Sequence, residues 1–411
     1  MIDNGDTAWV LTSSALVFIM VPGLAFFYAG LVRGKNALST LLQSFIALAI
    51  VGLTWILFGY SLSFGPDVGG FGFIGNLEWA GLHGVSATEA GPYAETIPHQ
   101  AFMVFQAKFA IITPALIAGA FAERIKFSTF VIFVVAWSTI VYTPLAHWMW
   151  GSGGWLGEAG ALDFAGGAVV HVSSGAAALA AALIFGRRLG FGQMEMAPHN
   201  VPFVVLGASL LWFGWFGFNA GSELGSAGRA TSAFVVTHIS ASTAAVVWVS
   251  LDWMINRRPS VVGAATGAVA GLATITPASG FVGPMPAVVI GLGAGALCYT
   301  AVWVKTRVRL DDSLDVWAIH GVGGIWGMLA AGLFIGVGFM TLGELTDLSR
   351  GRQVLMQLMA IGASFGWAFV TTLGILVVLK YTIGLRVDER QEEEGLDLSQ
   401  HGEEAYDTRP Q

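Results

Sequence analysis

Eleven long apolar segments constrain the fold of this chain more than any other feature of its sequence. A helix needs about 20 apolar residues to cross a bilayer, and in lipid only helices or closed barrels satisfy every backbone polar group. The sequence therefore predicts an all-α polytopic membrane protein with eleven transmembrane helices. We expect these spans at 8–31, 37–64, 99–122, 127–149, 164–186, 201–221, 231–254, 260–278, 283–304, 314–337 and 353–381.

Few charges interrupt these segments. Charged residues make up 11% of the 411 residues and hydrophobic residues 55%, whereas soluble domains contain roughly 25% charged residues. The net charge of −7 argues against nucleic acid as a partner. The only cysteine, Cys298, lies in an apolar stretch. It has no partner for a disulfide within one chain, and we expect it to be a small core residue.

Basic residues are concentrated in every second connection between the spans. By the positive-inside rule this pattern predicts that the N-terminus is outside and the C-terminus inside. The segment 65–98 is then the longest outer loop and is expected to cap the outer vestibule, and the N-terminal residues do not resemble a cleavable signal peptide. The basic connections contain Arg33, Lys35, Arg124, Lys126, Arg187, Arg188, Arg257, Arg258, Lys305, Arg307 and Arg309; the exceptions are Arg229, Arg350 and Arg352.

A short sequence recurs at the ends of two spans. Phe-Tyr-Ala-Gly at 27–30 ends the first span, and Phe-Asn-Ala-Gly at 218–221 ends the sixth. Because these spans run in opposite directions, the recurrence indicates two inverted five-helix halves, as in many transporters. The eleventh helix then lies outside the repeat. His171 and His320 fall on spans five and ten, which are equivalent positions in the two halves.

These two histidines stand alone in apolar surroundings. A charged side chain at the centre of a membrane helix costs about 2.5 kcal/mol or more, and a neutral imidazole still needs partners for its ring nitrogens. Two such residues in different spans indicate a polar site inside the bundle. We therefore expect His171 and His320 to belong to a transport pathway or a catalytic centre.

Aromatic side chains are expected in two layers on the outer side of His171. Phe105, Trp150 and Ser222 would form the outer layer, and Phe109 and Phe218 the layer beneath. Aromatic rings with one hydroxyl suit a small cation. A deeper pair of phenyl rings would form a hydrophobic gate that a hydrated ion crosses only at high cost.

Three charged residues near these layers have open roles. Asp163, eight residues before His171, is either a helix cap or a source of negative potential for the cation site. Asp315, five residues before His320, is expected to be a helix N-terminal or cap residue. Lys108 precedes Phe109 by one position, so we expect it to point away from the phenylalanine face and to pair or reach an interface.

Several strings of this sequence resemble the ammonium transporter family (Amt/Mep/Rh), and most closely its prokaryotic Amt branch. The similarity extends from about residue 28 to residue 406. The strings that carry it are PGLAFFYAGLVRGKN (22–36), GAFAERIKF (119–127), AHWMWGSGG (146–154), DFAGGAVVH (163–171), PHNVPFVVLGASLLWFGWFGFNAGS (198–222), IHGVGGIWG (319–327) and the tail GLRVDERQEEEGLDLSQHGEEAYD.

The resemblance implies a homotrimer in the plasma membrane with one pore in each subunit, no enzymatic activity and no cofactor. It implies a transporter domain at 1–385 and a cytosolic regulatory tail at 386–411, which a PII-type protein would recognise. Trp317 is bulkier than expected beside the second histidine. By matching motifs, Phe105, Trp150, Ser222 and Asp163 take the ammonium-recruitment site, Phe109 and Phe218 the phenylalanine gate, and His171 and His320 the pore pair.

The chemistry of the substrate explains this choice of residues. Ammonium and potassium are similar in size, but only ammonium donates hydrogen bonds and releases a proton. An ion pays a large desolvation cost in a dry pore, whereas ammonia pays little. Two imidazoles that share a hydrogen bond can accept ammonia and can relay the proton separately. The sequence leaves open whether transport is electroneutral or electrogenic.

Two other functions are alternatives. The first is an ammonium sensor of the same fold whose output is its tail; no fused signalling domain supports it. The second is an intramembrane metalloenzyme with His171 and His320 as ligands, which requires a third protein ligand.

The tail itself is acidic and is expected to dock reversibly. Gly384 and Gly395 would bracket a short helix that carries Glu389 and Glu392–Glu394. We expect these carboxylates to form exposed ion pairs with the inner loops around Arg124, Lys126, Arg187 and Arg188. Such pairs are weak, about 0–1 kcal/mol each, as a switch requires.

Overall fold

A computed structural model describes residues 1–406 of the chain. In this part, eleven helical segments are long and apolar enough to cross a membrane, as the sequence predicts. Their main helices are α1 (Asn4–Leu31), α2 (Ala37–Thr54) continued by α3 (Tyr60–Phe64), α4 (His99–Phe121), α5 (Phe127–Trp137) continued by α6 (Thr143–Trp150), α8 (Ser173–Phe185), α9 (Val201–Ala220), α10 (Gly228–Asn256), α11 (Val261–Ile275), α12 (Pro284–Arg307), α13 (Gly323–Phe334) and α15 (Arg350–Thr382).

The remaining α-helices and the strands are short and lie at the ends of the bundle. They are α7 (Trp155–Glu158), α14 (Leu342–Leu345), α16 (Glu389–Glu394) and a hairpin of β1 (Ala90–Gly91) and β2 (Ala94–Pro98). The first helix begins four residues earlier than the apolar pattern indicates. The reason is a cap, because the Asp3 carboxylate accepts a hydrogen bond from the backbone N–H of Asp6.

Turns of π-helix occur in four of the spans. Such turns leave backbone groups without their usual helical partners and are frequent at functional sites. Two of them interrupt spans two and four, at Trp55–Gly59 and Ser138–Tyr142. The other two open spans five and ten, at Gly167–Val172 and Trp317–Val322. Each of these last two turns contains one of the two predicted pore histidines.

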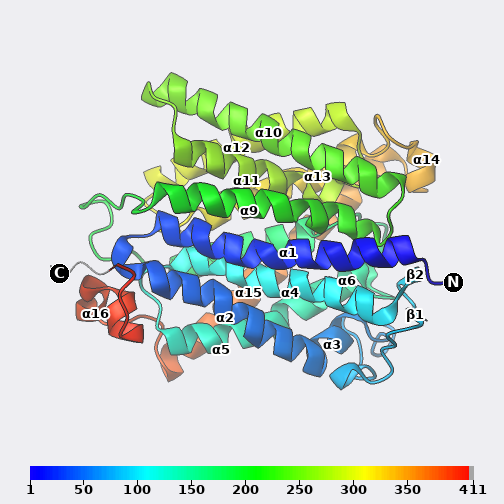
Figure 1. Ribbon diagram of the computed structural model, residues 1–411, viewed down its shortest axis with the longest axis horizontal. Coiled ribbons are helices and arrows are strands. Elements are labelled where there is room, and N and C mark those ends of the chain that lie inside the picture. Colours follow the sequence, from blue (N-terminus) through cyan, green and yellow to red (C-terminus); the bar gives the residue numbers. More distant parts are fainter. Residues whose placement is uncertain (407–411) are drawn as a thin grey trace.

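The two five-helix halves interlock through equivalent helices. Helices α1 and α9, the first of each half, lie side by side (Figure 1). Their backbones approach closely at Gly207, where a Cβ atom would lie 2.2 Å from the Phe27 nitrogen. Small residues at crossings are typical of membrane helices. Spans five and ten, the last of each half, also pack against each other. This arrangement confirms the predicted inverted repeat.

The two termini lie at opposite ends of the bundle (Figure 1). The N-terminal end carries the hairpin β1–β2, and the C-terminal end carries α16. The segment 65–98 covers part of the N-terminal end, where Tyr93 stacks on Phe102 of α4 with ring centroids 4.9 Å apart. An odd number of spans requires this separation of the termini.

The tail docks on the C-terminal end of the bundle through buried contacts. The predicted short helix is present as α16, which begins with a capping box at Asp388 and ends at Gly395 with φ of 108°. The Asp397 carboxylate accepts hydrogen bonds from the backbone N–H groups of Leu38, at 3.0 Å, and Ser39, at 2.8 Å. These N–H groups at the start of α2 have no partner within the helix, and a carboxylate is well suited to accept from them.

The expectation of exposed tail ion pairs is wrong. The Glu392 side chain is 2% exposed and forms an ion pair with Arg386 of the tail itself, at 2.6 Å. Its other oxygen accepts a hydrogen bond from the backbone N–H of Leu189, at 2.6 Å. The loop at Arg124 contacts the tail through its main chain, because the carbonyl of Arg124 accepts from the Val387 N–H. A buried carboxylate needs hydrogen-bond donors in direct contact with it, and the backbone N–H groups of loops supply them.

Candidate functional site

An aromatic cavity of about 190 Å³ opens at the N-terminal end of the bundle. It brings together Trp150, Ser222 and Phe109, three of the residues that the sequence analysis selects. Its walls come from the end of α3, the hairpin β1–β2, α4, the end of α6, the segment between α7 and α8, and the segment after α9. The residues that line it are Phe64, Tyr93, Phe102, Gln106, Phe109, Trp150, Phe164, Ser222 and Leu224.

The polar atoms of Trp150 and Ser222 are fixed by backbone carbonyls. The indole Nε1 of Trp150 donates to the carbonyl of Asp163 at 2.8 Å. The hydroxyl of Ser222 donates to the carbonyl of Phe218 at 2.8 Å. With its proton engaged in this way, the Ser222 oxygen keeps lone pairs that can accept a hydrogen bond. The cavity can therefore hold a small cation between aromatic rings and an acceptor.

Two phenyl rings lie beneath this cavity. Phe109 and Phe218 have ring centroids 4.2 Å apart and an interplanar angle of 31°, and both are buried. Phe109 also meets the ring of Trp150 edge-on, with centroids 6.1 Å apart. No hydrated ion passes between two rings at this separation unless the rings move. The pair thus has the geometry of a hydrophobic gate.

Phe105 does not line the cavity, although the sequence places it in the outer layer. Its ring is fully buried and packs edge-on against Phe109, with centroids 5.0 Å apart. Gly221 makes room for it, since a Cβ atom there would lie 2.8 Å from the Phe105 ring. Phe105 therefore supports Phe109 from behind, while Phe109 itself faces the cavity.

The two histidines meet directly below the phenyl rings. The Nδ1 atoms of His171 and His320 are 3.1 Å apart, and the rings are nearly parallel at 17°. Both side chains are buried, with 1% and 4% exposure. Their helices approach this closely because the residues at the crossing, Gly175 and Gly321, have no side chains. A Cβ atom at Gly175 would lie 2.2 Å from the Cα atom of Gly321. The pairing joins the two halves of the repeat at its centre.

This contact fixes what the pair can offer to a ligand. One Nδ1 must carry a proton and donate, and the other must accept. The donor then has an Nε2 that accepts, and its partner has an Nε2–H that donates. Within the described residues, the Nε2 atom of His171 has no hydrogen-bond partner. The pair therefore presents one acceptor and one donor, which match the N–H groups and the lone pair of ammonia.

A narrow cavity of about 60 Å³ continues from the histidines toward the C-terminal end. Most of its wall is apolar, and Trp215 stacks on His171 with ring centroids 5.5 Å apart. An apolar wall gives a neutral solute an easier passage than an ion. Its lining includes Leu24, Tyr28, Leu31, Ile112, Leu116, Val170, His171, Leu211, Trp215, Phe218, Val262, Val269, Leu314, Asp315, Ile319 and His320.

Asp163 caps the turn that carries His171. Its carboxylate accepts hydrogen bonds from four consecutive backbone N–H groups, those of residues 166–169, at 2.8, 2.5, 2.7 and 3.2 Å. Burial raises the pKa of this carboxyl, while the four N–H groups act to lower it. Because Asp163 also accepts from Trp150 through its carbonyl, it holds both the outer indole and the histidine turn.

Asp312 is the counterpart of Asp163 in the second half and was not predicted as a cap from the sequence. Its carboxylate accepts from the backbone N–H of Trp317, at 2.8 Å, at the start of the turn that carries His320. Asp315, selected as the cap, forms an ion pair with Lys305 instead. The signal was present in the sequence, since Asp163 and Asp312 each precede a histidine by eight residues.

Lys108 and Trp317 both point toward neighbouring helices. The Lys108 ammonium lies 5.6 Å from the centre of the Phe18 ring of α1. This contact agrees with the expectation that Lys108 points away from the phenylalanine face. Trp317 packs edge-on against Phe365 of α15, with ring centroids 5.8 Å apart. Among residues 1–406, no three His, Cys, Asp or Glu side chains come together to hold a metal.

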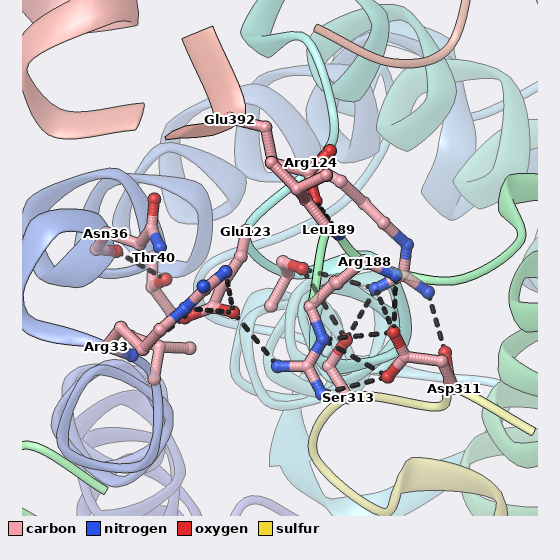
Figure 2. A network of polar contacts seen from close by, with 12 residues as sticks. Arg33, Asn36, Thr40, Glu123, Arg124, Arg188, Leu189, Asp311, Ser313 and Glu392 are labelled. Carbon is pink, nitrogen blue, oxygen red and sulfur yellow. Dashed lines mark hydrogen bonds and ion pairs between the residues drawn. The ribbon is translucent and has the colours of Figure 1, made fainter. Parts of the chain in front are cut away.

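A buried ionic network lies at the C-terminal end, between the pore helices and the tail (Figure 2). Arg188 forms ion pairs with Asp311, at 2.8 Å, and Glu123, at 3.0 Å, and Arg33 also pairs with Glu123. Burial raises the pKa of Glu123, but Arg188 and Arg33 lower it by more, so that it lies below its ordinary value. Burial lowers the pKa of Arg124 to about 10.

Comparisons with known proteins agree with this geometry. The Ammonium Transporter Family model matches residues 8–406. The chain is 47% identical over 405 residues to an ammonium transporter of Bacillus subtilis and to ammonium transporter Amt1 of Archaeoglobus fulgidus; the matches cover 98% of this chain and 98% and 99% of the relatives.

Solved structures with the same fold are also similar. The crystal structure of Saccharomyces cerevisiae Mep2 has a TM-score of 0.87 and 37% identity, and the match covers 95% of this chain and 89% of that one. A structure described as a sensor Amt protein has a TM-score of 0.89 and 31% identity, with 97% and 98% covered. This multi-pass membrane protein, with its paired histidines beneath two phenyl rings, belongs to the ammonium transporter family.

Proposed function

We propose that this ammonium transporter recruits the ammonium ion at the aromatic cavity, removes a proton from it at the phenyl gate, and conducts ammonia past the two histidines. The observation that carries this proposal is the contact between His171 and His320 at 3.1 Å, directly beneath a gate formed by two phenyl rings. Entry and conduction thus have separate sets of side chains.

The recruitment step depends on properties that ammonium does not share with potassium. Ring faces attract any small cation, but only ammonium donates a hydrogen bond to the free lone pairs of Ser222. We assign recruitment to Trp150 and Ser222, with Phe105 positioning the Phe109 ring and Asp163 holding the Trp150 indole. The buried carboxylate of Asp163 also contributes negative potential near the site.

The conduction step depends on the cost of desolvation. An ion that enters the dry passage between Phe109 and Phe218 loses its hydration, whereas ammonia loses little. The paired imidazoles then accept ammonia through one Nε2 and donate to it through the other. A proton that moves from one imidazole to the next can follow separately, which would make transport electrogenic.

We further propose that the N-terminal end faces outward and the C-terminal end inward, as the basic connections indicate. Each subunit of a homotrimer would contain its own pore. Residues 1–385 would form the transporter domain and residues 386–411 a regulatory tail. The docked contacts of Glu392 and Asp397 support such a role, because they link the tail to the loops beside the pore helices. A PII-type protein is the proposed partner.

A sensor of the same fold is the second candidate, and similarity to the sensor Amt protein favours it. The two functions differ in flux. A sensor would bind ammonium with little net transport, whereas the proposed transporter would carry a steady flux through each pore.

The test uses the purified protein in proteoliposomes, with ammonium uptake and membrane current recorded across a pH series. Wild-type protein is expected to carry ammonium and to exclude potassium. His171→Ala should lose this selective transport, because a lone imidazole offers only half of the contact, and it should admit potassium through the widened pore. Binding without uptake in the wild-type protein would favour the sensor. A folded His171→Ala variant with wild-type rate and selectivity would exclude the proposed histidine relay.

A further inference from the structure

Helix α4 presents one polar side chain to the aromatic cavity. Phe102, Gln106 and Phe109 are spaced four and three residues apart, so they share one face of the helix. All three line the cavity, together with Trp150 and Ser222. Gln106 is therefore the one amide in a wall that is otherwise aromatic or aliphatic apart from the Ser222 and Tyr93 hydroxyls.

The amide oxygen of Gln106 is buried and has no hydrogen-bond partner among the described residues. Buried polar atoms are nearly always paired in folded proteins, and an exception requires an explanation. Its position beside a cation cavity supplies one. An unpaired acceptor next to aromatic rings is complementary to a ligand that carries both positive charge and N–H groups.

The other polar groups of the cavity do not compete for this oxygen. The Trp150 indole donates to the carbonyl of Asp163, and the Ser222 hydroxyl donates to the carbonyl of Phe218. The Tyr93 hydroxyl donates to the carbonyl of Phe64 at 2.6 Å. These three donors are thus already engaged by the backbone. The acceptors that remain for a ligand are the oxygens of Ser222 and Gln106.

We propose that Gln106 is a second hydrogen-bond acceptor for the ammonium ion at the recruitment site, and that it determines selectivity there. This assignment rests on the proposed function of the cavity. Ammonium has four N–H groups and can bond to both oxygens at once, so that two of its lost waters are replaced. Potassium has no N–H group, so it makes only an undirected ion–dipole contact with each oxygen. A 180° rotation of the Gln106 amide exchanges its oxygen and nitrogen, and a bound cation favours the orientation in which the oxygen faces it.

The prediction extends to alkylated substrates. Each methyl group removes one N–H donor from the ammonium ion and adds bulk. Methylammonium keeps three N–H groups and trimethylammonium keeps one. The affinity of a site with two acceptors should therefore fall when the ligand has fewer than two N–H groups. After removal of one acceptor, ammonium should lose more affinity than trimethylammonium, since trimethylammonium can fill only one acceptor at a time.

The experiment measures ammonium uptake by proteoliposomes that contain wild-type protein or Gln106→Leu. A hydrogen bond to a charged donor is strong enough that we expect the KM for ammonium to rise about tenfold or more. The maximal rate should change by less than about twofold, because the gate and the histidines are untouched. Gln106→Glu, which retains an acceptor, should restore a low KM. Trimethylammonium, used as a competitor, should lose affinity by a smaller factor.

The control is Gln100→Leu, on the same helix but at its exposed end, where the amide only donates to the carbonyl of Val85. Its KM should equal that of the wild type. Gln106→Met, of nearly the same length, replaces Gln106→Leu if the latter fails to fold. A folded Gln106→Leu or Gln106→Met variant with a KM within about twofold of the wild type would overturn the assignment. Absence of uptake by the wild-type protein would instead overturn the proposed function.

Discussion

The transport path and the ion pairs of Arg188 at the C-terminal end treat buried polar groups differently. Near the aromatic cavity and the pore, the Gln106 oxygen and the His171 Nε2 atom are buried and have no hydrogen-bond partner among residues 1–406. At the C-terminal end, Arg188 alone makes hydrogen bonds to two carboxylates, those of Asp311 and Glu123. Polar groups whose hydrogen bonds are all made within the protein form a rigid structure, whereas polar groups without partners remain available to a ligand. The difference distinguishes the transport path from the framework that holds it.

The cost of each arrangement follows from desolvation. A buried charge without a partner is strongly unfavourable, and the ionic network avoids this by pairing each arginine. Glu123 even has a left-handed backbone, with φ of 70°, which the ion pairs with Arg33 and Arg188 help to maintain. Neutral groups, such as an amide or an imidazole, cost less when unpaired. The unpaired Gln106 and His171 groups of the transport path are therefore neutral, whereas the paired groups of the network are charged.

The largest effect is expected from Arg188→Ala. This variant leaves the carboxylates of Asp311 and Glu123 buried with fewer cations, which should cost about 3–5 kcal/mol of stability. Thermal unfolding in detergent would measure it. Arg187→Ala is the matched control, because Arg187 is the adjacent residue and is exposed. Equal unfolding temperatures for the two variants would contradict the view that this network is the framework.

A pH-dependent effect is expected at Asp312, whose carboxylate has one buried oxygen without a hydrogen-bond partner among the described residues. Burial raises its pKa from 3.8 to about 6, although Lys305 acts to lower it. Between pH 4 and 6 the folded state then binds more protons than the unfolded state, so this group's contribution to stability falls as pH rises through this window. The difference in pKa corresponds to roughly 3 kcal/mol.

Asp312→Asn should remove this contribution, since an amide does not titrate and still accepts from the Trp317 N–H. Unfolding temperatures recorded from pH 4 to 7 would show a smaller loss with rising pH in the variant than in the wild type. The same pH profile in both proteins would mean that Asp312 is already ionised at low pH.

A smaller effect is expected from Trp150→Leu, which removes one ring from the cation cavity. One ring contributes about 0.5–2 kcal/mol to the binding of a cation. The KM for ammonium should rise by the corresponding factor, and discrimination against potassium should weaken, with no loss of folding. An unchanged concentration dependence of uptake would remove Trp150 from the recruitment site.

The smallest effect on the folded structure is expected from truncation after Leu385. The tail docks on completed helices, so its removal should leave a folded trimer, detectable by size-exclusion chromatography. Because Glu392 and Asp397 contact the loops beside the pore, the transport rate or its response to a PII-type protein should change. Full transport with normal regulation in the truncated protein would show that the tail has no regulatory role.

Much of the fold was predictable because its signals are local. Long apolar segments and alternating basic connections specify spans without knowledge of their neighbours. The two histidines were also predictable, because an ionisable side chain in an apolar span is unusual wherever it lies. By contrast, Phe105 and Phe109 look equivalent in sequence. Only Phe109 lines the cavity, whereas Phe105 packs against Gly221 in the turn after α9, and no local pattern reports that contact.

The cap residues illustrate the same limit. Asp312 and Asp315 are both close to the start of span ten, and either is a plausible cap from sequence alone. The structure assigns the cap to Asp312 because Lys305, on the preceding helix, pairs with Asp315. The tail was misjudged for a similar reason. Its carboxylates look exposed in sequence, but Asp397 is 3% exposed because unpaired donors at the start of α2 lie within reach.

The sequence by itself determined the membrane class, the number of spans, the inverted halves and the two buried histidines. These features follow from hydrophobicity and spacing along one segment, which act before any tertiary contact forms. Only the tertiary structure decided which polar atoms are satisfied and which are left free. That depends on groups more than a hundred residues apart, such as the Nδ1 atoms of His171 and His320, whose contact requires the close crossing of two helices at Gly175 and Gly321.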